Sequence, residues 1–338
     1  MRASLTSALL LLPRTATTRS FTTHPADAEC DVVRVTKAVG DELRANILRV
    51  LATDSFGVQE LCSIFSSAQP ALSHHLKILR EVDLVSQRKE GTNIFYRRTS
   101  YGPGTLQSAL FEAIDAQTPA LKHLRQIDEL NQQRAQRSEA FFASNKDVLA
   151  QQDELICPTD VYLPCVMSSL PSQPKAQQRA MEVGPGSGAL LLQLAKRYDH
   201  VVGLDNSSTM LRTTAQSIAD QPAKTQIELV QQDFFNLIGS PRYDALVAAM
   251  VLHHMPSPEA FFEKAARLIA KQGHLVIAEL CSHTQAWVTD SVGDLWLGFE
   301  PSVLEQWALQ HGFQTTEQHH LAQRNGFRVQ VLSFQRNE

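Results

Sequence analysis

Residues 67–98 read SAQPALSHHLKILREVDLVSQRKEGTNIFYRR, and this stretch decides the fold of the N-terminal part of the chain. Its first half has leucines at helical spacing, and Pro70 suits the first turn of a helix. The leucines are Leu72, Leu76 and Leu79. Its second half alternates polar and apolar residues on both sides of Gly91, which is typical of a β-hairpin. The stretch therefore predicts a helix followed by a two-stranded wing.

The face of this helix opposite the leucines carries polar side chains that can hydrogen-bond base edges and phosphates in a major groove. They are Gln69, Ser73, His74 and Lys77. Arg88 and Lys89 add positive charge to the predicted wing. Between residues 69 and 98, six basic and three acidic side chains give a local charge of +3, although the whole chain has a net charge of -4. Positive charge is thus concentrated where DNA would lie.

Residues 31–99 resemble the ArsR family of winged-helix repressors. The resemblance implies a homodimer on a palindromic DNA operator, with interface helices near residues 31–39 and within residues 105–116. Many members sense metals through two cysteines on the helix before the recognition helix. Here Cys62 stands alone, because Ile64 occupies the place of the second thiol. One thiolate cannot build such a site, so we expect no bound metal.

A glycine-rich loop marks the second half of the chain. Residues 180–183, which are apolar except for Glu182, predict a short strand. It runs into Gly184-Pro185-Gly186-Ser187-Gly188 and then into a helical pattern. Glycines at such a turn let the backbone approach a ligand closely. The same spacing also fits the dinucleotide-binding fingerprint, so by itself the loop leaves an NAD-dependent enzyme open.

The strands that follow end in acidic residues. Asp205 follows residues 201–204, and Asp233 comes soon after residues 227–230. Together with the glycine loop, residues 178–334 resemble class I S-adenosylmethionine-dependent methyltransferases. The resemblance implies that the cofactor is S-adenosylmethionine or S-adenosylhomocysteine, with Asp205 at the ribose and Asp233 at the adenine. Glu182 would stand at the start of the motif, and the methionine moiety would be bordered by Gly184, Gly186 and Gly188.

His253 and His254 lie at the carboxyl end of a predicted buried strand, residues 243–255, and are the candidate catalytic residues. Methyl transfer from a sulfonium needs mainly positioning, with a base only if the acceptor must lose a proton. The alternative is that both rings shape the pocket or bond to backbone. The residues do not name the methyl acceptor.

The length of 338 residues predicts two domains or more. We divide the chain into a disordered or mis-started tail (1–30), an ArsR-type winged helix of α+β class (31–100), a helical dimerisation or connector region (101–178) and an α/β Rossmann-like methyltransferase domain (179–338). Five cysteines without CxxC spacing suggest a reducing compartment. No apolar run approaches the ~18 residues of a membrane span, so we expect a cytoplasmic protein without a membrane partner.

The sequence favours a dimeric, DNA-binding transcriptional regulator whose operator binding depends on the cofactor or on methyl transfer. Two versions stay open: the second domain methylates an acceptor, or it only senses S-adenosylmethionine or S-adenosylhomocysteine. A further alternative is a stand-alone methyltransferase whose winged helix serves only for dimerisation or docking.

Overall fold

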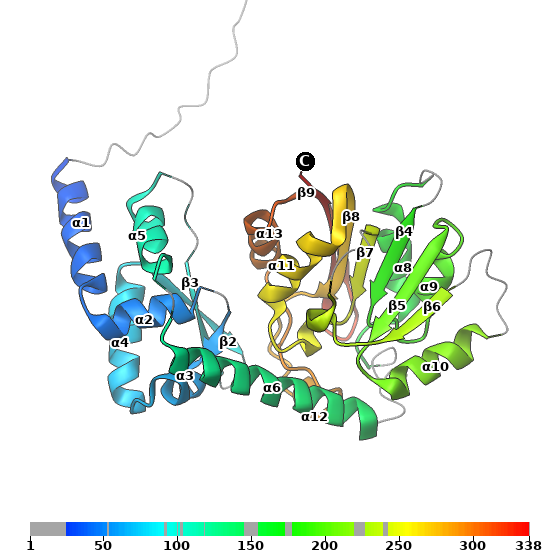
Figure 1. The fold of residues 1–338 in the computed structure, drawn as a ribbon, viewed down its shortest axis with the longest axis horizontal. Helices are drawn as coiled ribbons and strands as arrows, with labels where there is room; N and C mark the ends of the chain where they lie inside the picture. Colours follow the sequence, from blue (N-terminus) through cyan, green and yellow to red (C-terminus); the bar gives the residue numbers. More distant parts are fainter. Residues whose placement is uncertain are drawn as a thin grey trace, which may run out of the picture.

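The structure is a computed structural model, and it describes residues 25–52, 54–90, 93–99, 101, 104–117, 119–144, 155–172, 178–219, 227–238 and 243–337. Two lobes are joined by the long helix α6 (Leu121–Ser144), which runs along one side of both of them (Figure 1). Among the described residues, no helix is both long and apolar enough to cross a membrane. Helix α1 begins at Pro25, inside the stretch expected to be a tail, whereas residues 1–24 lie outside the described part.

The N-terminal lobe combines helices with a small antiparallel sheet of order β1-β3-β2. Its elements are α1 (Pro25–Val39), α2 (Glu42–Val50), β1 (Phe56–Gly57), α3 (Val58–Phe65), α4 (Gln69–Glu81), β2 (Val85–Glu90), β3 (Asn93–Arg98) and α5 (Leu106–Asp115). Leu72, Leu76 and Leu79 are fully buried on the inner face of α4, and Pro70 lies in its first turn. The predicted helix and its two-stranded wing are confirmed.

The C-terminal lobe is built on a seven-stranded sheet of order β6-β5-β4-β7-β8-β10-β9. Its strands are β4 (Arg179–Val183), β5 (His200–Asp205), β6 (Ile227–Gln231), β7 (Tyr243–Ala249), β8 (Ile269–Leu280), β9 (Phe313–Ala322) and β10 (Arg328–Arg336). Strands β6, β5, β4, β7 and β8 are parallel, whereas β10 is antiparallel to both of its neighbours. The predicted Rossmann-like architecture is confirmed.

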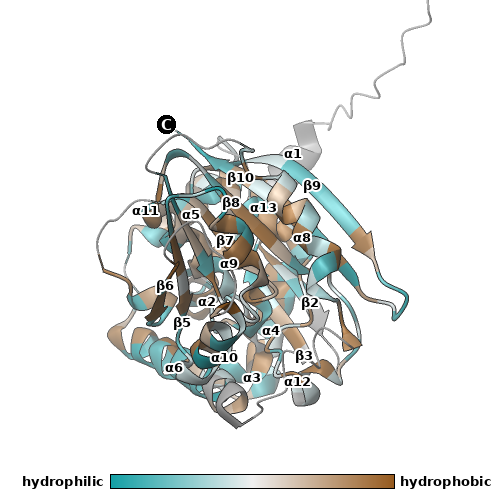
Figure 2. Cartoon of the chain, turned by 90° about the vertical axis from the view of Figure 1, so that its right-hand side faces the viewer, coloured by the Kyte–Doolittle hydropathy of each residue, from teal (hydrophilic) through white to brown (hydrophobic). Residues whose placement is uncertain are grey.

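Helices cover both faces of this sheet. They are α8 (Thr159–Ser168), α9 (Ala189–Leu194), α10 (Ser208–Ile218), α11 (Pro258–Leu268), α12 (Val288–Ser291) and α13 (Pro301–Gln310), with single 3-10 turns η1 (Phe234–Asn236) and η2 (Leu252–His254). Successive strand residues face opposite cores, since Ala180 packs with α8 and α9 whereas Met181 packs with α11 and α13. The inner strands are accordingly hydrophobic, and the edge strand β9 is largely hydrophilic (Figure 2).

Candidate cofactor cleft and DNA-binding face

A cleft opens at the carboxyl ends of β4, β5 and β7, where parallel α/β sheets bind their ligands. The predicted glycines form one of its walls. Gly184, Gly186 and Gly188 have φ of 69°, 50° and 76°, in the left-handed region that favours glycine. A Cβ on Gly184 would lie 2.6 Å from Cγ2 of Val251, so a larger residue does not fit there. The loop therefore brings bare backbone to the cleft.

Glu182 lies just before this loop and is buried. It lines a pocket next to the cleft, together with residues of the glycine loop, Thr159 and Tyr162, and the two share Gly184 and Gly186. Burial raises the pKa of its carboxyl well above the usual range. Among the described residues, no hydrogen bond reaches its Oε2. A buried, unsatisfied carboxylate oxygen fits the ammonium group of an amino-acid ligand, which would satisfy it.

Asp205 and Asp233 both line the cleft. Oδ1 of Asp205 accepts a hydrogen bond from the backbone N–H of Ser207 at 2.8 Å, and Oδ1 of Asp233 accepts one from Phe235 at 2.8 Å. These bonds fix both carboxylates and leave a second oxygen on each for a ligand. Burial raises the pKa of Asp205 to about 6, although the Ser207 bond opposes this shift. Four predicted cofactor residues thus line the cleft: Gly184, Gly186, Asp205 and Asp233. Glu182 lines an adjoining pocket that shares both of these glycines with the cleft, and Gly188 lines neither.

The connector helix α6 also contributes to this cleft. Ala135 and Ser138 line the cleft together with Asp205 and Asp233. The same helix contacts α3 of the N-terminal lobe and α10 of the C-terminal lobe. One helix therefore touches the cleft and both lobes.

Arg134, next to Ala135 on α6, connects the two lobes. Its Nη2 donates to Oε1 and Oε2 of Glu60 at 2.8 and 2.7 Å, and its Nη1 lies 3.5 Å from Oδ2 of Asp54. Nη1 also donates to the carbonyl oxygen of Pro256, in the cleft wall, at 2.8 Å. The guanidinium lies 5.0 Å from the ring centre of Trp296. We call Arg134, Asp54, Glu60 and Pro256 the Arg134 cluster.

The wing strand β3 packs against the C-terminal lobe beside this cluster. The rings of Phe95 and Trp296 are 5.2 Å apart, and the guanidinium of Arg97 lies 5.2 Å from the ring centre of Trp307. Burial raises the pKa of Glu259 to about 7, although the charge of Arg97 acts in the opposite direction. The lobes thus share an interface that mixes aromatic rings with charged groups.

The two candidate histidines have different surroundings. His253 is fully buried and is not among the residues lining the cleft; its Nδ1 lies 2.5 Å from Oε1 of Glu279. Burial lowers the pKa of His253, but the carboxylates of Glu279 and Asp294 outweigh it and raise this pKa to about 9. His254 does line the cleft, and burial together with the charge of His253 holds its pKa well below the usual range. Only His254 is placed to meet a ligand.

The predicted DNA-contacting residues of α4 share one surface. Gln69, His74 and Lys77 are exposed and Ser73 is half-buried. Lys77 forms a surface ion pair with Glu81, with 3.8 Å between Nζ and Oε1. Arg88 and Lys89 belong to β2, but their side chains lie outside the described residues.

Sequence reasoning missed the residues that α6 contributes, and it did not connect Asp294 with the histidines. A signal for Arg134 was present. Leu130 belongs to the apolar stripe of the connector, and Arg134 follows it by four residues, on the same face of the helix. A charge in an apolar stripe indicates a buried ionic contact.

Comparison with known proteins finds relatives of both lobes. The pattern described as "Bacterial regulatory protein, arsR family" matches residues 41–87. An uncharacterised HTH-type transcriptional regulator from Methanocaldococcus jannaschii is 44% identical over 61 residues, which is 18% of this chain and 68% of that protein. The chain belongs to the ArsR family. Its C-terminal lobe matches the pattern described as "Methyltransferase domain" over residues 181–277.

Two further relatives match one lobe each. The HTH-type transcriptional regulator KmtR from Mycobacterium tuberculosis is 40% identical over 22% of this chain and 56% of its own length. A ubiquinone biosynthesis O-methyltransferase from Alkalilimnicola ehrlichii is 24% identical over 39% of this chain and 58% of its own length. The chain thus spans less than two thirds of either relative. The solved N-methyltransferase NodS from Bradyrhizobium japonicum, in complex with S-adenosyl-l-homocysteine, is 15% identical over 61% of this chain and 99% of NodS, with a TM-score of 0.48.

Proposed function

We propose that this ArsR-family protein is a cytoplasmic, homodimeric transcriptional regulator whose affinity for operator DNA depends on S-adenosylmethionine or S-adenosylhomocysteine in the C-terminal cleft. The observation that carries the proposal is the position of α6. Ala135 and Ser138 line the cleft, while Arg134 of the same helix holds Glu60 of α3, the helix that precedes the recognition helix. A ligand that moves α6 therefore acts on the DNA-binding lobe directly. Coupling requires that the ligand favour one of two arrangements.

The cleft and the adjoining pocket together offer a partner for each part of the proposed cofactor. Glu182 would accept hydrogen bonds from the ammonium group, Asp205 from the ribose hydroxyls and Asp233 from the adenine amino group. Gly184 and Gly186 would let the backbone approach the methionine moiety. The bound cofactor would supply an activated methyl group. His254 is the candidate group to meet an acceptor at the cleft, where its lowered pKa keeps the ring neutral and able to accept a hydrogen bond.

Dimerisation is supported by apolar side chains on the helices where ArsR resemblance predicts the interface. Val32 and Val33 of α1 are 45% and 47% exposed, and Leu106 of α5 is 37% exposed. Exposed apolar side chains on both of these helices fit a surface that a partner covers. A second copy of this chain would bring two α4 helices to a palindromic operator.

The proposal is tested by fluorescence anisotropy with the DNA upstream of the gene for this protein. The protein is titrated alone, then with S-adenosylmethionine, then with S-adenosylhomocysteine. We expect one ligand to shift the DNA affinity about tenfold, equivalent to about 1.4 kcal/mol of coupling. Lys77→Glu should weaken DNA binding in all three titrations and leave the cofactor affinity unchanged. Equal DNA affinity in all three titrations would contradict coupling, and absent DNA binding would favour a stand-alone methyltransferase.

Cofactor binding is expected to weaken in acid. The pKa of Asp205 is raised to about 6 by burial, and the carboxylate must be ionised to accept hydrogen bonds from both ribose hydroxyls. Below pH 6, Asp205 must therefore lose a proton when the cofactor binds. The cofactor affinity should fall as the pH is lowered through this range, by up to about tenfold per pH unit. Calorimetry with S-adenosylhomocysteine from pH 5 to 8 measures the slope.

Asp205→Asn is the control for this pH dependence. Burial also raises the pKa of Glu182, which makes cofactor affinity depend on pH in the same direction. The test of Asp205 is therefore the part of the pH dependence of affinity that Asp205→Asn removes. An unchanged slope in the variant, or tighter binding as the pH falls, would contradict the assignment of Asp205.

A further inference from the structure

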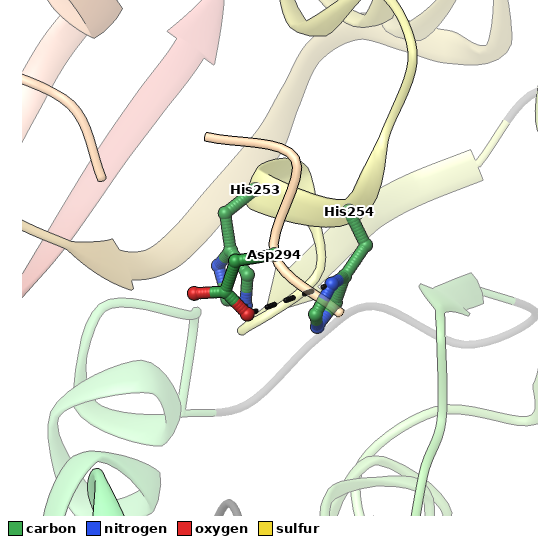
Figure 3. Close-up of side chains that lie close together, drawn as sticks. All are labelled: His253, His254 and Asp294. Atoms are coloured by element: carbon green, nitrogen blue, oxygen red, sulfur yellow. Dashed lines mark ion pairs between the residues drawn. The ribbon is translucent and has the colours of Figure 1, made fainter. Parts of the chain in front are cut away.

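The side chains of His253, His254 and Asp294 lie close together (Figure 3). The histidines belong to η2, and Asp294 lies in the loop after α12. Oδ1 of Asp294 is 3.8 Å from Nε2 of His253 and 3.8 Å from Nδ1 of His254. Each residue offers one ligand atom, and these three atoms all lie within 4.8 Å of one another. Two imidazole nitrogens and a carboxylate oxygen are thus gathered by chain segments 40 residues apart in sequence.

The three residues are buried, and two of them, His253 and Asp294, have polar atoms without a hydrogen bond among the described residues. His253 and Asp294 are fully buried, and His254 is 7% exposed. Among the described residues, no hydrogen bond reaches Nε2 of His253 or either carboxylate oxygen of Asp294. Buried polar atoms are nearly always satisfied in native proteins, so three neighbouring exceptions indicate a missing partner.

The surrounding bonds hold the trio in place. Glu279 accepts from the backbone N–H of His253 at 3.2 Å and bonds to its Nδ1, which leaves Nε2 facing Asp294. The backbone N–H groups of Leu295 and Trp296 both donate to the carbonyl oxygen of His253, which ties the Asp294 loop to η2. A carboxylate on the far nitrogen of a histidine is the usual support of a metal-binding ring.

We propose that His253, His254 and Asp294 bind a divalent transition-metal cation, with Zn²⁺ the best-fitting ion. Imidazole and carboxylate are ligands of zinc-type cations, whereas Mg²⁺ and Ca²⁺ take oxygen ligands. A tetrahedral ion with bonds of about 2.0–2.2 Å holds its ligand atoms about 3.3–3.6 Å apart, so the trio needs only a small contraction. Binding through Nδ1 of His254 replaces its hydrogen bond to the carbonyl oxygen of Gly293.

The charge balance and the access route agree with a cation. Asp294 and Glu279 place two carboxylates in a fully buried volume. A dication bound at Nε2 of His253 would displace the proton that this ring otherwise carries and would balance both carboxylates. His254 lines the cleft, which gives the ion a path from solvent. Three protein ligands leave a coordination position of a tetrahedral ion open, as in zinc sites that bind water or a substrate.

The test is calorimetric titration of ZnCl₂ into the full chain after dialysis against a chelator. We expect one ion per chain and at least tenfold weaker binding in Asp294→Asn, which keeps the side-chain shape but removes the charge. The double variant His319→Gln/His320→Gln removes a surface histidine pair near Glu317 and should bind as tightly as the wild type. Zinc should also raise the unfolding temperature of the wild type.

Three outcomes would overturn the proposal: no binding to the wild type, undiminished binding in Asp294→Asn, or loss of binding in the His319/His320 double variant. Circular dichroism verifies that Asp294→Asn is folded. If it is not, His254→Gln at the cleft surface takes its place, with the same tenfold loss expected. Co²⁺ provides a second readout, because its visible absorption band should appear in the wild type and be absent from the ligand variants.

Discussion

Replacing Arg134 by methionine is expected to lower the free energy of unfolding by about 3–5 kcal/mol and to abolish the effect of the cofactor on DNA binding. Methionine keeps the apolar stem of the side chain but removes the charge that holds Glu60 and Asp54. Asp54 is only 3% exposed, so its carboxylate would lose its cationic partner without gaining water. Burial already raises the pKa of Asp54 to about 6 with Arg134 in place.

Loss of the coupling follows from the same contacts. Without Arg134, α6 still lines the cleft through Ala135 and Ser138, but its charged contact with α3 is gone. Cofactor affinity should therefore change less than the response of DNA binding to the cofactor. Thermal unfolding measures the loss of stability. Anisotropy with and without S-adenosylhomocysteine measures the response of DNA binding to the cofactor.

Arg137→Met is the matched control for this variant. Arg137 is an exposed arginine on the same helix, three residues further on. The substitution removes the same charge and should change stability by less than about 0.5 kcal/mol, because surface substitutions usually do. If Arg134→Met kept the full DNA response, or if both variants lost it equally, the Arg134 cluster would not carry the coupling.

Features that depend on local pattern could be predicted from the sequence. The leucine spacing of residues 72–79 placed α4, and the alternation around Gly91 placed the wing, since both periods follow from helix and strand geometry. The glycine loop and the acids after β5 and β6 marked the cleft, because the carboxyl ends of parallel strands meet at one edge.

Contacts between distant segments could not be predicted in this way. Arg134 meets Glu60 across 74 residues and Pro256 across 122 residues, and no local period relates such positions. Asp294 approaches the histidines only because its loop is bonded to η2. Nothing in the sequence pointed to a metal site here, because the expectation of no bound metal rested on the single thiol of Cys62, far from these histidines in the chain. The family resemblance identified the domains, whereas the contacts between them required the three-dimensional structure.

Replacing Gly186 by arginine is expected to weaken binding of S-adenosylhomocysteine at least 100-fold, or about 2.7 kcal/mol. Gly186 lines both the cleft and the adjoining pocket. Its carbonyl oxygen accepts a hydrogen bond from Oγ1 of Thr214 at 2.7 Å, and this bond holds the loop against α10. A long side chain at this position would occupy the space proposed for the cofactor. Calorimetry measures the affinity, and anisotropy should show DNA binding that no longer responds to the ligand.

The matched control for this variant is Gly312→Arg. Gly312 has a φ of 80°, and a Cβ there would meet no atom within 4 Å. Both substitutions add the same charge and place a side chain in the left-handed region, at a cost of about 1–2 kcal/mol each. The two variants therefore carry similar backbone strain, but only the arginine at position 186 would block the cleft. Loss of affinity in Gly186→Arg alone supports the cleft as the cofactor site, whereas retained affinity would place the cofactor elsewhere.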